Sequence, residues 1–362
     1  MKVLISGGGT GGHIFPALSI ANALRHRDPD TEILFVGADN RMEMERVPAA
    51  GYKIVGLPVA GFVRRKLWRN IPVLYKLWKS MNMAGKVLRD FKPDIAIGVG
   101  GYASGPMLKR VQKAGIPTLI QEQNSYAGVT NKLLAKNAGA ICVAYDNMDR
   151  FFPADKITMT GNPVRADILD CKVSKEDAKK ELGFDPKRPL VVMVGGSLGA
   201  RAMNDAMKVA LRPIVEAGAS VLWQSGKNYA DECAEAAKGV ENAIATPFIS
   251  RMDLVYKAAD ILVSRAGAST ISEIQLVGIP SILIPSPNVA EDHQRKNALA
   301  LVEKDAAVMI PDNECSEELA PTVIRLLKDN EARERLAVNA AKMGLKNADE
   351  KIVDKIYELL NK

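Results

Sequence analysis

The sequence of 362 residues is poor in residue types that often carry chemistry. It holds four cysteines, three histidines and only 5% aromatic residues. The cysteines are far apart and form no CxxC pair, which argues against a zinc site and a disulfide framework. Free, widely spaced cysteines are typical of a protein in a reducing cytoplasm.

Long apolar runs, low-complexity tracts and a leader are also missing from the sequence. The apolar stretch after Lys2 meets glycines at Gly7, too early for a signal peptide or a spanning helix. With 47% apolar and 25% charged residues, the composition is that of a soluble globular protein. We therefore expect a protein that stays inside the cell, and at this length we expect two domains.

Short apolar strands alternate with helical stretches along the whole chain. The strands are continuous apolar runs, a pattern that predicts parallel sheets buried on both faces. In the first half they are predicted at 2–6, 32–37, 53–57, 94–99, 118–121, 140–144 and 157–160. In the second half they are predicted at 190–194, 220–224, 243–246, 260–263, 281–284 and 307–310.

This alternation predicts an α/β protein with two Rossmann-like doubly wound parallel-sheet domains that face a cleft. The first domain is expected to span 1–163 and the second 164–362, with the last helix able to pack back on the first domain. In open parallel sheets, ligands bind at the carboxyl ends of the strands. The loops that follow predicted strands are therefore the places to look for a site.

A glycine loop follows the first strand of each predicted domain. The first satisfies G-x-G-x-x-G through Gly7, Gly9 and Gly12, a dinucleotide fingerprint that is weak on its own. Asp39 lies 27 residues after Gly12 rather than about 20, which does not favour a dinucleotide. Two loops, one per domain, indicate a ligand held from both sides; the alternative is that the glycines only permit tight turns.

The second predicted domain adds polar groups to its glycine loop. Residues 195–200 would offer amides and the Ser197 hydroxyl to a diphosphate. Glu273 lies one turn inside a predicted helix, where a carboxylate can accept hydrogen bonds from the vicinal hydroxyls of a ribose. The alternative is that Glu273 only caps that helix. Further along, 292–294 could meet the hydroxyls of a sugar.

Seven segments, in one order over residues 7–298, resemble the MurG family of bacterial glycosyltransferases. They are GGGTGGHIFPA, GVGGYASGP, QEQN, GNPVR, GGSLGAR, SRAGASTISE and EDHQRKNA. Members of the family have the GT-B architecture and transfer N-acetylglucosamine from UDP-GlcNAc to the muramoyl-pentapeptide of lipid I, which yields lipid II for peptidoglycan. The resemblance implies an acceptor-binding first domain, a donor-binding second domain, and inverting transfer to the muramoyl 4-hydroxyl.

The resemblance also implies roles for individual residues. Donor contacts are implied for Thr10, Gly11, Gly12, Asn124, Arg165, Ser197, Ile249, Ala268, Ser269, Thr270, Glu273 and Gln294. Among these, the Ile249 backbone would meet uracil, Glu273 the ribose, and Gln294 the transferred sugar. Acceptor and phosphate loops are expected to contribute Gly8, Gly9, Gly101, Tyr102 and Ser104. Where the family often has histidine this chain has Gln121, and an amide cannot act as a base there.

The attacking hydroxyl needs a base, and histidine is the side chain that titrates near neutral pH. His26 is expected to be exposed at a helix end and His293 lies in the sugar-contacting stretch, so His13 is our candidate for the base. The alternative for His13 is a positional or phosphate-contacting role. We expect neither metal nor cofactor, because the D-x-D string at 28–30 is typical of a solvated turn and the loop amides would stabilise the diphosphate.

The segment 57–92 holds nine basic residues and one acidic residue, which accounts for the chain's net charge of +7. Apolar and aromatic residues lie among these cations: Leu67, Trp68, Ile71, Leu74, Tyr75 and Trp78. This combination is typical of a helix at a membrane interface, attracted to anionic lipid; the alternative is a helix that only covers a sheet. We expect peripheral attachment to the cytoplasmic face of the bacterial cell membrane and other cell-wall synthesis proteins as partners. Nucleic acid is not expected.

Other functions fit these sequence features less completely. A nicotinamide-dependent dehydrogenase would use the first glycine loop and leave the second glycine loop without a function. A diacylglycerol glycosyltransferase or a UDP-GlcNAc 2-epimerase would share the UDP site but differ in the acceptor loops. A non-catalytic membrane adaptor would need no nucleotide-shaped site.

Overall fold

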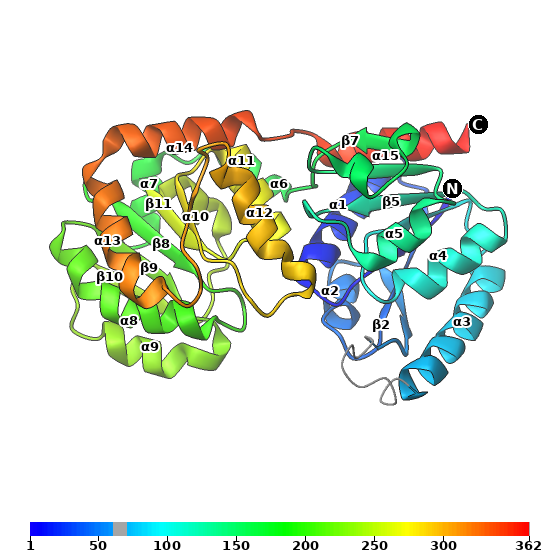
Figure 1. Cartoon of the computed structure of the whole chain (residues 1–362), viewed down its shortest axis with the longest axis horizontal. Helices are drawn as coiled ribbons and strands as arrows, with labels where there is room; N and C mark the ends of the chain where they lie inside the picture. The colour runs from blue at the N-terminus through cyan, green and yellow to red at the C-terminus, as the bar shows by residue number, and fades with distance from the viewer. Residues whose placement is uncertain (61–70, 362) are drawn as a thin grey trace. The chain divides into compact units, whose positions relative to one another are not determined.

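The computed structural model describes residues 1–60 and 71–361 and divides into two compact units (Figure 1). The first unit is Met1–Val164 with Leu345–Lys362, and the second is Arg165–Gly344. The chain thus enters the second unit beside the boundary predicted near residue 163. It returns to the first unit for its last helix, so the second unit is shorter than the predicted 164–362.

The first unit is built on a seven-stranded parallel sheet in the order β3-β2-β1-β4-β5-β6-β7. Its strands are β1 (Lys2–Ser6), β2 (Glu32–Ala38), β3 (Lys53–Leu57), β4 (Ile95–Gly98), β5 (Thr118–Glu122), β6 (Ala140–Val143) and β7 (Ile157–Met159). The order turns back between β1 and β4. In open parallel sheets, ligands bind outside the carboxyl ends of the strands at such a switch point.

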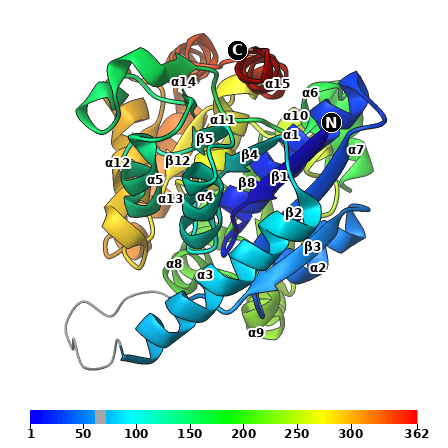
Figure 2. The same cartoon turned by 90° about the vertical axis from the view of Figure 1, so that its right-hand side faces the viewer.

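Helices cover both faces of this sheet. They are α1 (Gly11–Arg27), α2 (Glu43–Ala49), α3 (Ile71–Phe91), α4 (Ser104–Lys113), α5 (Val129–Ala135) and α15 (Ala348–Leu360), with 3-10 turns η2 (Met148–Arg150) and η3 (Ala154–Lys156). Adjacent strand residues point to opposite faces: Ile5 packs with α1 and α15, and Leu4 packs with α3 and α4. Figure 2 shows α3 and α4 side by side. Ile352 and Ile356 of α15 are buried in the α1 core, which explains why the last helix belongs to this unit.

The second unit repeats the plan with six parallel strands in the order β10-β9-β8-β11-β12-β13. Its strands are β8 (Leu190–Val194), β9 (Ser220–Gln224), β10 (Ala243–Thr246), β11 (Ile261–Ser264), β12 (Ser281–Leu283) and β13 (Val308–Met309). The switch point lies between β8 and β11. Helices α8 (Arg201–Glu216) and α13 (Cys315–Lys328) bury their apolar sides in one core with β8, β9 and β11.

The remaining helical segments of the second unit lie between and after these strands. They are α6 (Ala166–Leu169), α7 (Lys175–Glu181), η4 (Lys227–Tyr229), α9 (Ala230–Ala237), α10 (Met252–Ala258), α11 (Ala268–Val277), η5 (Ala290–Asp292), α12 (His293–Val302) and α14 (Asn330–Lys342). Every predicted strand has a counterpart whose ends differ by one residue at most. The predicted fold class, two Rossmann-like parallel-sheet domains, is confirmed.

Candidate functional site

Two glycine loops meet at the switch point of the first unit. The loop after β1 carries Gly8, and the loop after β4 carries Gly100 and Gly101, both with positive φ (93° and 86°). A Cβ at Gly101 would lie 2.4 Å from the carbonyl oxygen of Gly8, and a Cβ at Gly100 would lie 2.9 Å from His13 Nε2. Because any side chain would collide, the two loops can approach each other this closely only through glycine.

His13 stands in the first turn of α1, directly after the first glycine loop. Its Nδ1 lies 3.1 Å from Thr10 Oγ1, and the edge of the ring with Nε2 lies against Gly100. When Nδ1 carries the proton and donates it to Thr10, Nε2 is the nitrogen that can accept a proton. The loops therefore hold the imidazole in a defined orientation.

Glu43, at the start of α2, holds the first glycine loop in place through hydrogen bonds. No signal in the sequence pointed to this residue. Its side chain is 1% exposed. Its Oε1 accepts from the amides of Ala38 (2.9 Å) and Gly9 (3.0 Å), and its Oε2 also lies 3.0 Å from the Gly9 nitrogen. The amide of Gly9, a residue predicted for the acceptor and phosphate loops, thus donates its hydrogen bond within the protein. A glutamate in a first helical turn is ordinary in a sequence, so its burial could not be foreseen.

A second buried glutamate shapes the loop that carries Asn124. Glu122, at the end of β5, is 2% exposed. It accepts hydrogen bonds from the amides of Asn124 (3.1 Å) and Gly128 (3.0 Å) and from Asn131 Nδ2 (2.9 Å). Asn124 Nδ2 also donates to Glu122 Oε1 at 3.2 Å. The predicted site residue therefore sits in a loop held by a carboxylate.

Gln121 is buried in a network of amides at the ends of the central strands. Its Nε2 donates to Asn162 Oδ1 at 2.8 Å, and Asn162 Nδ2 donates to the carbonyl of Gln123 at 2.9 Å. The Gln123 amide donates back to Gln121 Oε1. The side chain that departs from the family pattern is thus occupied in linking β5 to the segment around Asn162.

Two of the predicted acceptor-loop residues differ sharply in exposure. Tyr102 is exposed, whereas Ser104 is buried. Ser104 Oγ lies 2.6 Å from the Ser6 carbonyl oxygen and 2.9 Å from that of Gly100, within donating distance of both. The Ser104 hydroxyl therefore closes the second loop onto β1 in this structure and is not presented to a ligand.

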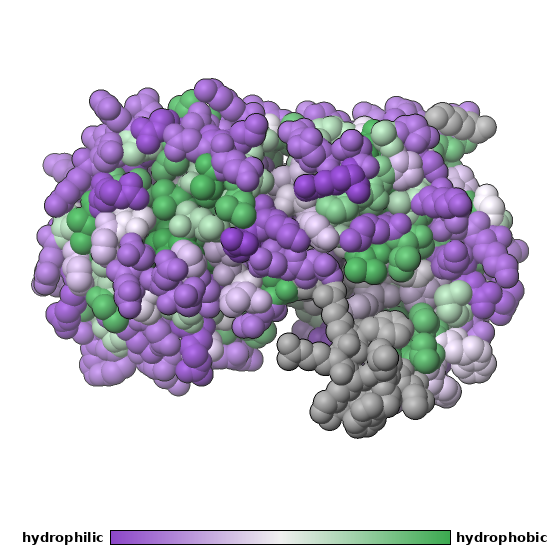
Figure 3. Space-filling model, in the orientation of Figure 1, coloured by the Kyte–Doolittle hydropathy of each residue, from purple (hydrophilic) through white to green (hydrophobic). Residues whose placement is uncertain are grey.

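Helix α3 exposes the apolar residues that were predicted to meet a membrane. Leu74, Tyr75 and Trp78 are 55%, 62% and 64% exposed, and the rings of Tyr75 and Trp78 stack at 6.2 Å. Val73 is buried, and Ala84 packs in one core with Leu4 and Val36 of the sheet, so the helix both covers the sheet and presents an apolar surface. Figure 3 shows green and purple residues side by side along α3.

The side chains of three of the predicted membrane residues are not described by the structure. Leu67 and Trp68, with the side chain of Ile71, lie outside the described residues. Within the described part of the chain, no helix combines the length and apolar character needed to cross a bilayer.

The glycine loop of the second unit lies between β8 and α8. It packs on the loop after β9, where a Cβ at Gly226 would lie 2.0 Å from the Gly199 nitrogen. The Lys227 amide donates to the Ser197 carbonyl at 3.0 Å, which fixes the tip of the loop. Ser197 itself is exposed. The loop thus leaves Ser197 exposed at the switch point, four residues before α8 begins.

Arg165, Tyr256 and Glu273 lie together in the second unit. The Tyr256 hydroxyl, on α10, donates to Glu273 Oε2, on α11, at 2.5 Å. Burial first, and then Glu273, hold the pKa of Tyr256 well above its usual range, while the charge of Arg165 lowers this pKa. Sequence reasoning found Arg165 and Glu273 but missed Tyr256, because a tyrosine within an apolar helix looks like a core residue.

Glu273 is not needed as a cap for α11. That helix begins at Ala268 with Gly267 as its N-cap residue, so Glu273 lies beyond the first turn. The first turn is formed by the predicted residues Ala268, Ser269 and Thr270. Ser269 Oγ is a buried atom that has no hydrogen-bond partner among the described residues.

Ile249 and Gln294, the other two predicted donor contacts of this unit, are held by hydrogen bonds. The Ile249 amide donates to Gln224 Oε1 at 3.3 Å, so a backbone contact to a base would use the Ile249 carbonyl or displace Gln224. Gln294, near the start of α12, accepts from the Ser286 amide at 2.9 Å through its Oε1. Ile249 follows β10, and Gln294 lies in the helix start that was predicted after a strand.

The D-x-D string forms the turn after α1. Asp28 accepts from Thr31 Oγ1 at 2.9 Å and from the Asp30 amide at 3.1 Å. The Thr31 hydrogen bond is the largest cause that lowers the pKa of Asp28. The first carboxylate is thus engaged within the turn.

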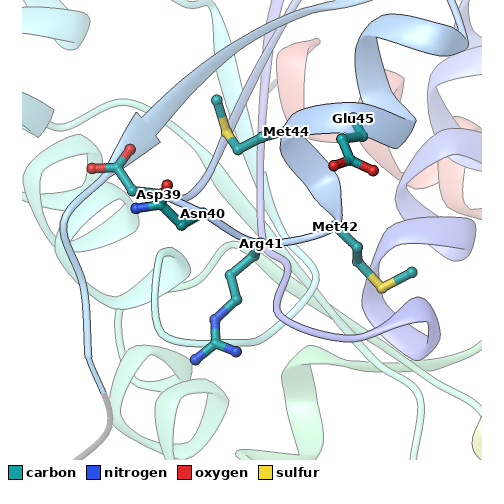
Figure 4. Close-up of a pocket in the computed structure, with 6 residues that line it drawn as sticks. All are labelled: Asp39, Asn40, Arg41, Met42, Met44 and Glu45. Atoms are coloured by element: carbon teal, nitrogen blue, oxygen red, sulfur yellow. The ribbon is translucent and has the colours of Figure 1, made fainter. Parts of the chain in front are cut away.

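A pocket of about 820 Å³ opens between the end of β2 and the start of α2 (Figure 4). It is lined by Asp39, Asn40, Arg41, Met42, Met44 and Glu45. None of these was predicted as a site residue. Glu43, which separates two of the lining residues, is instead bonded to Gly9.

Comparison with known proteins places this geometry in a family. The N-terminal domain model of glycosyltransferase family 28 matches residues 3–143, and the C-terminal domain model matches residues 190–352. Curated relatives from Parabacteroides distasonis and Phocaeicola vulgatus are 53% and 54% identical, each over 100% of this chain and 99% and 97% of their own. Both are named UDP-N-acetylglucosamine–N-acetylmuramyl-(pentapeptide) pyrophosphoryl-undecaprenol N-acetylglucosamine transferase.

Solved structures agree with these matches. Acinetobacter baumannii MurG superposes with a TM-score of 0.80 at 29% identity over 99% of both chains. A UDP-GlcNAc 2-epimerase from Neisseria meningitidis reaches a TM-score of 0.69 at 15% identity, over 99% of this chain and 100% of its own, and shares the fold alone. The full-length matches show that the chain belongs to glycosyltransferase family 28, in the MurG family of N-acetylglucosamine transferases.

Proposed function

We propose that this protein transfers N-acetylglucosamine from UDP-GlcNAc to the muramoyl sugar of lipid I and so forms lipid II for peptidoglycan synthesis. The observation that carries the proposal is the 53% identity, over the whole chain, with a relative named for this transfer. The predicted motif loops also follow strands in both units, where Rossmann-like sheets bind their ligands.

The chemistry we propose is a single inverting displacement. The 4-hydroxyl oxygen of the muramoyl sugar attacks the anomeric carbon, a new glycosidic bond forms, and the bond from that carbon to the diphosphate breaks. The hydroxyl proton passes to His13 Nε2, which the contact of Nδ1 with Thr10 supports. The electron pair of the broken bond leaves with UDP.

In this proposal the second unit holds the nucleotide. The N-terminus of α8 and the loop of Ser197 would bind the diphosphate, since free amides and the helix dipole favour negative charge. Glu273 would accept from the ribose, and Gln294 would meet the transferred sugar. Because amides stabilise the leaving group, the proposal includes no metal and no cofactor. Contacts to the donor from Thr10, Gly11, Gly12 and Asn124 stay predictions of the resemblance.

The proposal is tested by measuring UDP release by the purified full-length protein. We expect release only when UDP-GlcNAc and a short-chain lipid I analogue are both present, and product analysis should show one β-linked N-acetylglucosamine per acceptor. UDP-GalNAc and UDP-glucose serve as donor controls. Transfer to diacylglycerol, or conversion of UDP-GlcNAc to its 2-epimer without acceptor, would replace the proposal by one of the alternative functions.

We also propose that α3 holds the protein at the cytoplasmic face of the cell membrane. Leu74, Tyr75 and Trp78 are more than half exposed, and exposed Lys76 and Lys79 lie on the same helix. Apolar residues would enter the interface while the lysines meet anionic headgroups. A lipid-linked acceptor gives this placement a purpose. A partnership with other cell-wall synthesis proteins stays an expectation of the resemblance.

Replacing Leu74 and Trp78 together by serine is expected to weaken binding to vesicles by about 100-fold or more, because each buried large apolar side chain contributes about 1.5–3 kcal/mol. The measurement is sedimentation with vesicles of phosphatidylglycerol and phosphatidylethanolamine. Val209→Ser removes another exposed apolar residue, in α8, and should change nothing. Wild-type binding should fall as salt rises, and equal partitioning at low and high salt would contradict the proposal.

A further inference from the structure

The contact between Tyr256 and Glu273 is partly buried and joins α10 to α11. Tyr256 is 4% exposed, and its hydroxyl donates a hydrogen bond to the Glu273 carboxylate at 2.5 Å. A buried tyrosine hydroxyl usually finds such a partner. Here the partner is the carboxylate that is proposed to accept hydrogen bonds from the ribose, so the hydroxyl affects the ligand site as well as the packing.

The geometry restricts how Glu273 can turn. A glutamate side chain has three rotatable bonds, and a helix surface leaves its carboxylate several orientations. The phenol donates its single proton to Oε2, which fixes that oxygen toward α10. A carboxylate has about four acceptor positions on its two oxygens, so acceptor capacity remains for a ligand's hydroxyls.

The Tyr256 phenol is suited to this task because it does not lose its proton. Burial, and then the neighbouring carboxylate, raise its pKa well above the usual range. A phenol that stays neutral remains a donor to the carboxylate at every pH at which the protein works. The positive charge of Arg165 lies nearby and acts against these two effects, because it lowers the pKa of Tyr256.

We propose that Tyr256 is a positioning residue that orients the Glu273 carboxylate toward the ribose hydroxyls of the uridine nucleotide and so sets the preference for ribose over deoxyribose. This inference rests on the proposed function, in which Glu273 accepts from the ribose. Tyr256 itself would touch no substrate.

The test measures the affinity of the full-length protein for UDP, 2′-deoxy-UDP and 3′-deoxy-UDP by titration calorimetry. Tyr256→Phe keeps the ring and removes only the hydroxyl. We expect UDP to bind about 10- to 150-fold more weakly, in keeping with the loss of one hydrogen bond to a charged group. At least one deoxy analogue should change by less than twofold, so the ratio between UDP and that analogue shrinks. KM for UDP-GlcNAc should rise with kcat nearly unchanged.

Two further variants separate the possible outcomes. Glu273→Gln tests the ribose assignment itself, and an unchanged ratio in that variant would overturn the assignment. If Glu273→Gln removes the preference and Tyr256→Phe leaves the ratio intact, the positioning role is wrong. Equal weakening of all three nucleotides in Tyr256→Phe would show a merely structural role and also overturn it.

Tyr145→Phe is the matched control. Its hydroxyl is buried and has no hydrogen-bond partner among the described residues, and it lies in the first unit. We expect this variant to bind all three nucleotides as the wild type does. Thermal unfolding of each variant shows that the compared proteins are folded.

Discussion

Replacing His13 with alanine is expected to lower kcat by about 10²- to 10⁴-fold, the usual contribution of a positioned general base. The imidazole is oriented by Thr10 at Nδ1 and lies against Gly100 near Nε2. Without it the attacking hydroxyl must lose its proton to water. KM for UDP-GlcNAc should change little, because the proposed nucleotide contacts with Ser197 and Glu273 lie in the second unit.

Steady-state kinetics with a lipid I analogue measure this effect over a range of pH. Because an imidazole accepts a proton only when it is neutral, wild-type activity should fall at acid pH, and this fall should be absent from the residual activity of His13→Ala. His26→Ala is the matched control, since His26 is exposed in the last turn of α1. Near-normal turnover of His13→Ala would exclude His13 as the base, whereas a low rate that keeps the acid limb would indicate a positional role.

Glu43→Gln is expected to lower kcat/KM for the lipid I analogue by about 100-fold, because small displacements of a positioning loop cost this much. The substitution keeps the size of the side chain. If its oxygen takes the place of Oε1, it still accepts from Ala38 and Gly9, but its amide group then lies 3.0 Å from the Gly9 nitrogen. Two donors face each other there, and the glycine loop must move.

The control for this substitution is two residues away. Glu45 is exposed at the start of the same helix, and Glu45→Gln should keep full activity. The affinity of Glu43→Gln for UDP should change much less than its kcat/KM for the acceptor. If folded Glu43→Gln protein retains its acceptor kcat/KM, the loop does not depend on this carboxylate.

Strands and the loops after them could be predicted because their causes are local. A strand of a parallel sheet covered on both faces must be apolar at nearly every position. The predicted strands at 140–144 and 190–194 show this pattern in five consecutive residues each. The glycines of the first loop are likewise visible as glycines. Which loop each would approach was not visible, since Gly101 meets Gly8 only after β1 and β4 pair.

Buried polar contacts could not be predicted, because their partners are distant in sequence. Glu43 reaches back to Gly9, and Tyr256 reaches forward to Glu273, across 34 and 17 positions. Ser104 resembled a phosphate-loop serine in the sequence, but it is buried against the Ser6 carbonyl of a strand 98 positions earlier. Only the packed helices and strands bring such groups together.

By itself the sequence determined two parallel-sheet domains, the order of their strands along the chain and the family, and it predicted the loops in which a site is expected. The tertiary structure alone decided which residues of α3 stay exposed and which carboxylates hold the loops. The physical reason is that apolar periodicity encodes burial for a segment alone. A hydrogen bond between buried groups depends on the spacing of elements that only the folded chain sets.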